Sequence, residues 1–268
     1  MAKKLVVSFD GTWNEPNVGN DTNVWKFHQS IIGYEYKDPD LHGPPSGSPA
    51  SQTIKWYDEG VGTVWHDRLG GGLFGFGLSK NIAQGYQFLV NNYEDGDEIY
   101  LLGFSRGAYT ARSLSGLIRK IGLLKKDQPP VPEPEDNQAL VDGYKLYRER
   151  DHTPDSQTAE EFRTNHSSRI VKIKLIGVWD TVGSLGIPVE FLDMLNDRYK
   201  FLDVKLSGII EHAFHAVAID EHRKIFDVTL WNSEPKESQE VEQVWFAGAH
   251  SDVGGGSNLP PLSDLALG

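Results

Sequence analysis

Short apolar runs alternate along this chain with longer segments whose apolar residues recur at helical spacing. Strand-forming runs bounded by turn residues lie at 5–9, 53–57, 98–102, 170–179, 224–231 and 240–246. Helical spacing is found at 23–32, 78–93, 108–121, 137–150, 191–198 and 208–219. Strands that alternate with helices are typical of a parallel sheet with helices on both faces. We therefore predict an α/β fold built on a mostly parallel central sheet.

The pentapeptide G-F-S-R-G at 103–107 lies at a predicted junction between a strand and a helix. A strand that turns directly into a helix holds the corner residue in strained backbone angles, and flanking glycines leave room for the turn. The corner hydroxyl then stands above the sheet, and the helix N-terminus presents free N–H groups to developing negative charge. This context predicts that Ser105 is a nucleophile.

Residues of complementary chemistry follow predicted strands in the order Ser105, Asp180 and His250. A serine hydroxyl is a poor nucleophile until a neutral imidazole accepts its proton, and the imidazole needs a carboxylate to fix its tautomer. We predict that these residues form a catalytic triad. The acid stays open, because Asp252 lies two residues from His250 and Asp10 ends the first strand. Other histidines late in the chain are expected to be structural or exposed: His212, His215 and His222.

The polar groups around the predicted serine favour an oxyanion hole. We expect the backbone N–H of Arg106 to contribute to it, together with the N–H of Gly11 or Thr12. Two roles are open for the Arg106 side chain: binding a substrate phosphate, or anchoring the turn through an ion pair. Asp10 either borders this site at the carboxyl end of its strand or caps the following loop.

Four blocks of sequence extend the pattern over residues 8–256: SFDGTWN, GFSRGAYTAR, VWDTVG and WFAGAHSDVGGG. Together and in this order they resemble a family of α/β-hydrolases that was formerly of unknown function and includes phospholipase effectors of bacterial type VI secretion. The resemblance implies an α/β-hydrolase fold and the hydrolysis of lipid-like esters. It also favours Asp180 as the acid, because this residue lies in the VWDTVG block.

Composition narrows the partners and the chemistry. The net charge of −12 would repel a phosphate backbone, so we do not expect a nucleic acid partner. The chain has no cysteine, which excludes thiolate catalysis and zinc–thiolate sites. The first apolar run ends at Asp10, and no other run is long enough to span a membrane. We therefore expect a protein without a transmembrane segment that is cytoplasmic, or exported without a signal peptide.

Two further segments are predicted to lie near the substrate. Residues 70–77 place five glycines around Leu73, Phe74 and Phe76, which predicts a flexible apolar flap able to contact an acyl chain or a lipid surface. Residues 125–168 begin with prolines and become charged. They form either a cap or lid over the carboxyl edge of the sheet or a solvated excursion. We expect one hydrolase domain over 1–268 that includes this insertion.

These residues predict a serine hydrolase, of the lipase, phospholipase or esterase type, that cleaves a lipid or small ester through an acyl-enzyme. We expect no cofactor, and peripheral contact with a membrane is left open. Two alternatives remain. The side chains of Asp10, Asp180, His250 and Asp252 are also suitable ligands for the metal ion of a phosphohydrolase. The other alternative is a hydrolase fold that binds without turnover.

Overall fold

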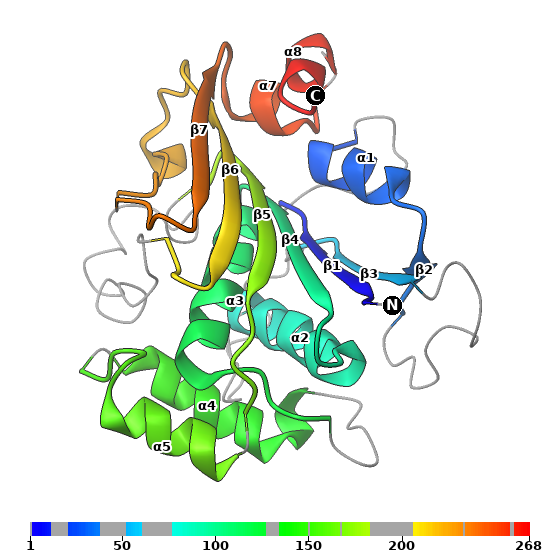
Figure 1. Ribbon diagram of the computed structural model, residues 1–268. Coiled ribbons are helices and arrows are strands. Elements are labelled where there is room, and N and C mark those ends of the chain that lie inside the picture. The colour runs from blue at the N-terminus through cyan, green and yellow to red at the C-terminus, as the bar shows by residue number, and fades with distance from the viewer. Residues whose placement is uncertain are drawn as a thin grey trace.

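The computed structural model describes residues 2–11, 21–37, 52–60, 77–126, 134–149, 151–166, 168–182, 206–232, 234–257 and 260–268. In these ranges, one seven-stranded sheet has the order β2-β3-β1-β4-β5-β6-β7, and all neighbouring strands are parallel (Figure 1). The strands are β1 (Lys4–Phe9), β2 (Tyr34–Glu35), β3 (Thr53–Asp58), β4 (Glu98–Phe104), β5 (Ile173–Trp179), β6 (Ile210–Ala218) and β7 (Glu240–Phe246). The strand order reverses between β1 and β4, which is where open parallel sheets bind ligands.

Helices cover both faces of the sheet. They are α1 (Asn23–Ser30), α2 (Gly77–Asn92), α3 (Arg106–Ile121), α4 (Gln138–Arg148), α5 (Gln157–Asn165), α7 (His250–Gly254) and α8 (Pro260–Leu265), with short 3-10 turns η3 (Pro134–Asp136) and η5 (Lys224–Phe226). The main core joins α2 and α3 to one face, and a smaller apolar cluster beside α1 and α7 lies on the other. Within the described ranges, no helix combines the length and apolar character needed to cross a bilayer. The predicted α/β architecture is confirmed.

The prediction of a helix over 208–219 is wrong, because most of this segment is β6. Apolar residues such as Ile210, Ala213 and Val217 also fit helical spacing, and a short buried strand cannot be told from a helix by periodicity alone. Strand β6 is paired on both sides, by β5 and β7, so the sheet determines its conformation. The strand predicted over 224–231 is also wrong: η5 occupies its start, and Val228 makes only an isolated bridge to Val182. The helix predicted over 191–198 lies outside the described residues.

The helices of the segment 125–168 lie away from the edge of the sheet that carries Ser105. Helix α3 starts at Arg106 and has 16 residues, so it carries the chain about 24 Å toward the opposite edge. At its far end, Lys120 donates to the carbonyl of Glu149, and Arg163 of α5 donates to the carbonyl of Lys120. Figure 1 shows α4 and α5 at one end of the molecule and α7 and α8 at the other. The placement of α4 and α5 therefore corrects the prediction of a cap over the carboxyl edge.

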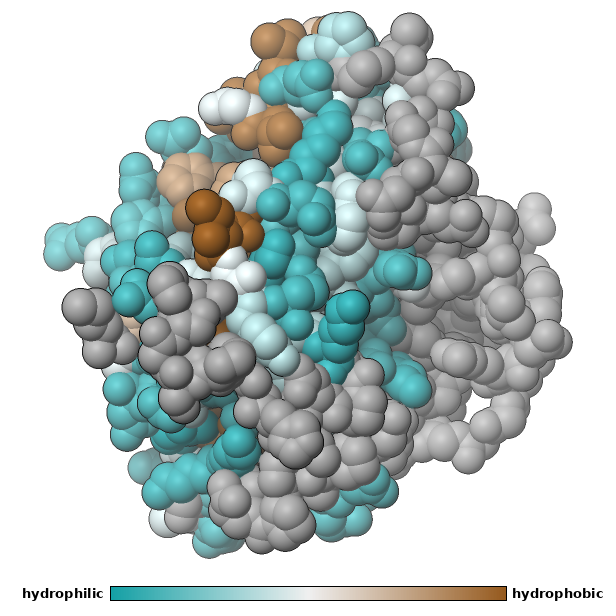
Figure 2. Space-filling view, turned by 90° about the vertical axis from the view of Figure 1, so that its right-hand side faces the viewer, coloured by the Kyte–Doolittle hydropathy of each residue, from teal (hydrophilic) through white to brown (hydrophobic). Residues whose placement is uncertain are grey.

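Several large apolar side chains are exposed on the side of the molecule that carries α1 and α8. They are Phe27, Ile32, Leu262 and Leu265. Figure 2 shows this side, with apolar residues in brown gathered in its upper part among hydrophilic residues in teal. An apolar area bordered by polar residues is suited to contact with lipid or with another protein.

Candidate active site

Ser105 occupies the sharp turn between β4 and α3. Its backbone angles are φ 57° and ψ −121°, which residues other than glycine seldom adopt. A Cβ atom added at Gly107 would lie 2.1 Å from the carbonyl oxygen of Phe9, and one at Gly103 would lie 2.6 Å from the Cα of Ala108. Both glycines are therefore required for steric reasons, and the pentapeptide forms the turn that the sequence predicts.

Replacing Gly107 by alanine is expected to destabilise the fold. The new methyl group would collide with backbone atoms of β1 that cannot move without disturbing the sheet, so we expect a loss of about 3 kcal/mol in the free energy of unfolding. Gly177→Ala on β5 is the matched control, because its Cβ would meet the mobile end of the Leu102 side chain at 3.3 Å. Urea unfolding of both variants measures the difference. Equal stability of the two variants would contradict this account of the turn.

The structure brings Ser105, Asp180 and His250 into one hydrogen-bonded chain. The Nε2 atom of His250 lies 2.8 Å from the Ser105 Oγ, and the Nδ1 atom lies 2.5 Å from the Asp180 Oδ2. All three residues are buried, with exposed fractions of 7% for Ser105, 0% for Asp180 and 5% for His250. Because a carboxylate can only accept, Nδ1 carries the proton and Nε2 is free to accept from the serine hydroxyl.

Two aromatic rings and a bond to its backbone help to hold His250. Phe104 and Phe226 lie on it, with ring centroids 4.6 Å and 4.7 Å away. The backbone N–H of His250 donates to Glu221 at 3.3 Å, and Glu221 is paired with Arg223 at 2.6 Å. Hydrogen bonds from Arg223 lower the pKa of Glu221 to about 2, so this acceptor stays ionised. The ring is therefore fixed in position by neighbours that the sequence did not indicate.

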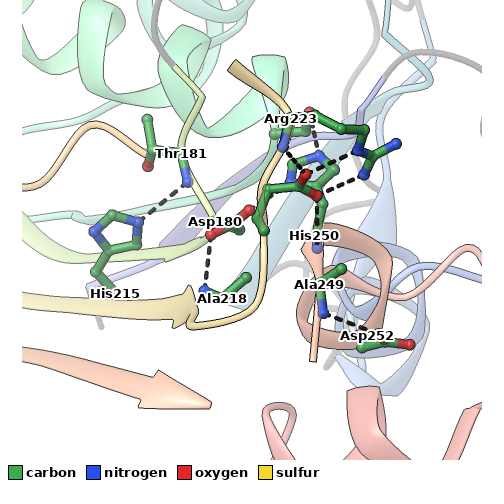
Figure 3. Close-up of polar contacts among 10 residues, drawn as sticks. Asp180, Thr181, His215, Ala218, Arg223, Ala249, His250 and Asp252 are labelled. Carbon is green, nitrogen blue, oxygen red and sulfur yellow. Dashed lines mark hydrogen bonds and ion pairs between the residues drawn. The ribbon is translucent and has the colours of Figure 1, made fainter. Parts of the chain in front are cut away.

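The other two candidate acids make different contacts. The Asp252 Oδ2 accepts from the N–H of Ala249 at 2.9 Å at the start of α7 (Figure 3). Asp10 accepts from Thr22 at 2.5 Å and from Tyr57 at 2.6 Å. Burial and the Asp10 charge raise the pKa of Tyr57 well above its usual range, so its hydroxyl remains a donor. The carboxylate that contacts the His250 ring is that of Asp180.

The groups predicted for the oxyanion hole are only partly described. The N–H of Gly11 donates to the Asp10 Oδ1 at 2.7 Å, whereas Thr12 lies outside the described residues. Arg106 is the first residue of α3, and burial lowers the pKa of its guanidinium. Within the described ranges its side chain makes no ion pair, and both predicted roles of this side chain stay open. The predicted flap lies outside the described residues, apart from Gly77 at the start of α2.

The four residues of the metal alternative do not converge. Asp180 and His250 bond to each other, Asp252 bonds to the start of its own helix, and Asp10 bonds to hydroxyl groups and a backbone N–H. In the part of the chain that the structure describes, no group of three or more histidine and carboxylate side chains is arranged to hold a metal ion. This geometry does not favour the phosphohydrolase alternative.

Comparison with known proteins adds family membership to this geometry. The model of the family described as "T6SS, Phospholipase effector Tle1-like, catalytic domain" matches residues 3–268. The chain belongs to this family. The match confirms the resemblance seen in the four sequence blocks. The Tle1-like chain is also 31% identical over 247 residues to the uncharacterized protein YEL023C of Saccharomyces cerevisiae, covering 84% of the chain and 32% of the yeast protein.

Two solved structures share the fold of this Tle1-like chain. An uncharacterized protein from Pseudomonas aeruginosa has a TM-score of 0.53 at 17% identity, over 99% of this chain and 44% of that one. The Tle1 effector bound to the VgrG spike of the type VI secretion system has a TM-score of 0.50 at 19% identity, over 97% of this chain and 52% of that one. The chain thus spans about a third of the yeast relative and about half of the chains in these two solved structures.

The Tle1-like chain contains a second serine–histidine–carboxylate arrangement. The Ser8 Oγ lies 2.9 Å from the Nδ1 of His28, whose Nε2 lies 3.0 Å from Glu35. Ser8 and His28 are completely buried, and Ser8 lies within β1 rather than at a turn. No substrate can reach a hydroxyl in that position. Contact geometry alone therefore does not define a nucleophile. Ser105 differs from Ser8 in its place at the turn between β4 and α3 and in the 7% of its surface that stays exposed.

Proposed function

We propose that this chain is a serine ester hydrolase that cleaves lipid-like carboxylic esters. Ser105 is the nucleophile, His250 the general base and Asp180 the acid that orients it. The observation that carries the proposal is the hydrogen-bonded chain from the Ser105 Oγ through His250 to Asp180, with distances of 2.8 Å and 2.5 Å. Membership of a family of phospholipase effector catalytic domains supports an ester of lipid character.

In the proposed mechanism, the Ser105 Oγ attacks the ester carbonyl carbon while the His250 Nε2 accepts the hydroxyl proton. Asp180 stabilises the imidazolium that forms, and the N–H of Arg106 faces the developing oxyanion at the start of α3. The imidazolium then protonates the leaving alcohol, which departs and leaves an acyl-serine. Water, activated by the same imidazole, hydrolyses the acyl-serine and releases the carboxylic acid.

The Arg106 side chain is proposed to bind the phosphate of a phospholipid next to the scissile ester. It follows the proposed nucleophile directly, and it forms no ion pair within the described ranges. A partly buried guanidinium is suited to a phosphate, whose oxygens match its planar donors. Apolar side chains beside α1 and α8 support peripheral contact with a lipid surface as part of the same proposal.

Replacing Arg106 by methionine is expected to lower kcat/KM for a phospholipid, relative to a neutral p-nitrophenyl ester, by about 10- to 100-fold. This range follows from the value of a hydrogen bond to a charged group. Arg119→Met is the matched control, because Arg119 lies on the same helix and pairs with Asp155 at the far end. The rates of both substrates are measured for each variant. An unchanged ratio in Arg106→Met would exclude phosphate recognition by this side chain.

One substrate panel tests the proposed function as a whole. It contains p-nitrophenyl esters of increasing chain length, phospholipid vesicles and p-nitrophenyl phosphate, each with and without a chelator. The proposal expects ester cleavage that is insensitive to chelator and no phosphatase activity. Cleavage of the phosphate that stops in chelator would support the metal alternative, and absence of turnover on every substrate would support a binding protein.

A further inference from the structure

The turn that carries Asp180 is strained. Asp180 has φ 36°, a backbone conformation that residues with side chains seldom adopt and that persists only where surrounding contacts impose it. Its N–H donates to the carbonyl of Ala216 at 2.7 Å, and its Oδ1 accepts from the N–H of Ala218 at 2.9 Å. Both partners lie on β6, so this strand holds the turn from one side.

The next residue, Thr181, gains its support from a histidine on the same strand. Its backbone N–H donates to the Nε2 of His215 at 3.1 Å, as Figure 3 shows, and its carbonyl accepts from the N–H of Thr229 at 2.8 Å. Thr181 is completely buried, so water cannot replace the histidine as the acceptor. A buried N–H without an acceptor costs about 1–3 kcal/mol. The Asp180–Thr181 turn therefore depends on the unprotonated Nε2 of His215.

A glutamine fixes the tautomer of His215. The Oε1 of Gln243 accepts from the N–H of Trp231 at 2.8 Å, and its Nε2 donates to the carbonyl of Trp231 at 3.0 Å. These two bonds determine which end of the amide is the oxygen. This oxygen also faces the Nδ1 of His215 at 3.3 Å, so the imidazole proton lies on Nδ1 and Nε2 is left as an acceptor.

The imidazole of His215 stays in its uncharged form near neutral pH. Its burial, together with the nearby positive charge of Arg112, lowers its pKa to about 3. Arg112 also donates to the carbonyl of Thr229 and lies over the ring of Trp231 at 5.1 Å. The imidazole is therefore a constant hydrogen-bond acceptor within a rigid support that reaches from α3 to β7.

We propose that His215 is a positioning residue that acts through Asp180. The Nε2 of His215 accepts a hydrogen bond from the N–H of Thr181 and so maintains the strained turn. The turn in its place directs the Asp180 carboxylate to the Nδ1 of His250. The role rests on the proposed function, since the carboxylate orients the proposed base. His215 itself lies against Thr181, Gln243 and Trp231.

His215→Leu is expected to lower kcat by up to about 100-fold with KM changed less than about twofold, because a small displacement of the acid misaligns the base. His215→Gln is expected to stay within about threefold of wild type, since its side-chain oxygen reaches the place of Nε2. His212→Leu is the matched control: His212 lies on the same strand and pairs with Glu240 near the surface. Equal losses in the leucine variants at both positions would overturn the proposal.

A double-mutant cycle separates positioning from general support of the fold. In the Asp180→Asn background, His215→Leu is expected to reduce kcat by less than about threefold further, because the group through which it acts is already lost. A full multiplicative loss would overturn the proposal.

If the leucine variant does not fold, His215→Asn replaces it, because asparagine reaches only the place of Nδ1. Equal activity of the asparagine and glutamine variants would then overturn the proposal.

Proton NMR tests the same inference without using activity. The His250 Nδ1–H held by Asp180 is expected to give a low-field resonance, assigned by its loss in His250→Gln. It should persist in His215→Gln and disappear or move in His215→Leu. An unchanged resonance in the leucine variant overturns the role of His215. Wild-type protein that cleaves no ester contradicts the proposed function instead, so the two failures are distinguishable.

Discussion

Ser105→Ala is expected to abolish ester hydrolysis, with a fall in kcat of about 10⁶, the scale seen when the nucleophile of a serine hydrolase is removed. The variant should fold, because alanine has the same Cβ as serine and meets no more backbone strain at this turn. It loses the hydrogen bond between the Ser105 hydroxyl and His250. An active-serine phosphonate should label wild-type protein at Ser105 and leave the variant unlabelled, as measured by mass spectrometry of the digested protein.

Ser113→Ala provides the control for this experiment. Ser113 is also a buried serine, and it lies on α3, where its hydroxyl donates to the backbone carbonyl of Tyr109. Its replacement should leave both the rate and the labelling close to those of wild type. Phosphonate labelling at another serine, or a Ser105→Ala rate within about tenfold of wild type, would exclude Ser105 as the nucleophile.

Asp180→Asn is expected to reduce kcat by about 10⁴ with little change in KM, the scale of the effect when a triad histidine is left in the wrong tautomer. Asparagine can keep the bond from Ala218 through its oxygen, but its amide then presents an N–H to His250. The imidazole must accept there, so its proton moves to Nε2 and the ring can no longer accept from Ser105. Steady-state kinetics on a soluble ester measure this effect.

Asp252→Asn is the matched comparison, because Asp252 and Asp180 were both candidates for the acid. The Asp252 carboxylate accepts from the N–H of Ala249, and an asparagine oxygen can accept in the same way. We expect its turnover to remain within about threefold of wild type. If Asp252→Asn or Asp10→Asn lost more activity than Asp180→Asn, the acid would have to be reassigned.

Much of the candidate site could be predicted because it is encoded locally. The turn at Ser105 depends on glycines two residues away on each side, and all the strands of the described sheet are parallel. In such a sheet, the residues that follow β4 and β5 must emerge at the same edge. Ser105 and Asp180 were therefore predictable as residues of one edge, and His250 follows β7 at that edge. That β4 and β5 are adjacent is a finding of the structure.

The choice among the acids could not be predicted in the same way. Asp180, Asp252 and Asp10 all follow strands. The family resemblance favours Asp180, but strand patterns do not show which carboxylate faces the His250 ring. The answer depends on the hydrogen bonds of each carboxylate. The N–H of Ala249 donates to Asp252 within the start of α7, Thr22 and Tyr57 donate to Asp10, and Asp180 contacts the His250 Nδ1 from 70 positions away. Periodicity likewise failed for β6, which is a strand because two partner strands flank it.

By itself, the sequence determined the α/β class, the turn at Ser105 and the chain order of serine, acid and histidine, because strand and turn propensities act over a few residues. Only the tertiary structure decided which carboxylate meets His250, that α4 and α5 lie at the far edge of the sheet, and that His215 supports the Asp180 turn. These features depend on contacts between residues tens of positions apart, where geometry is set by packing and by the need to satisfy buried polar groups.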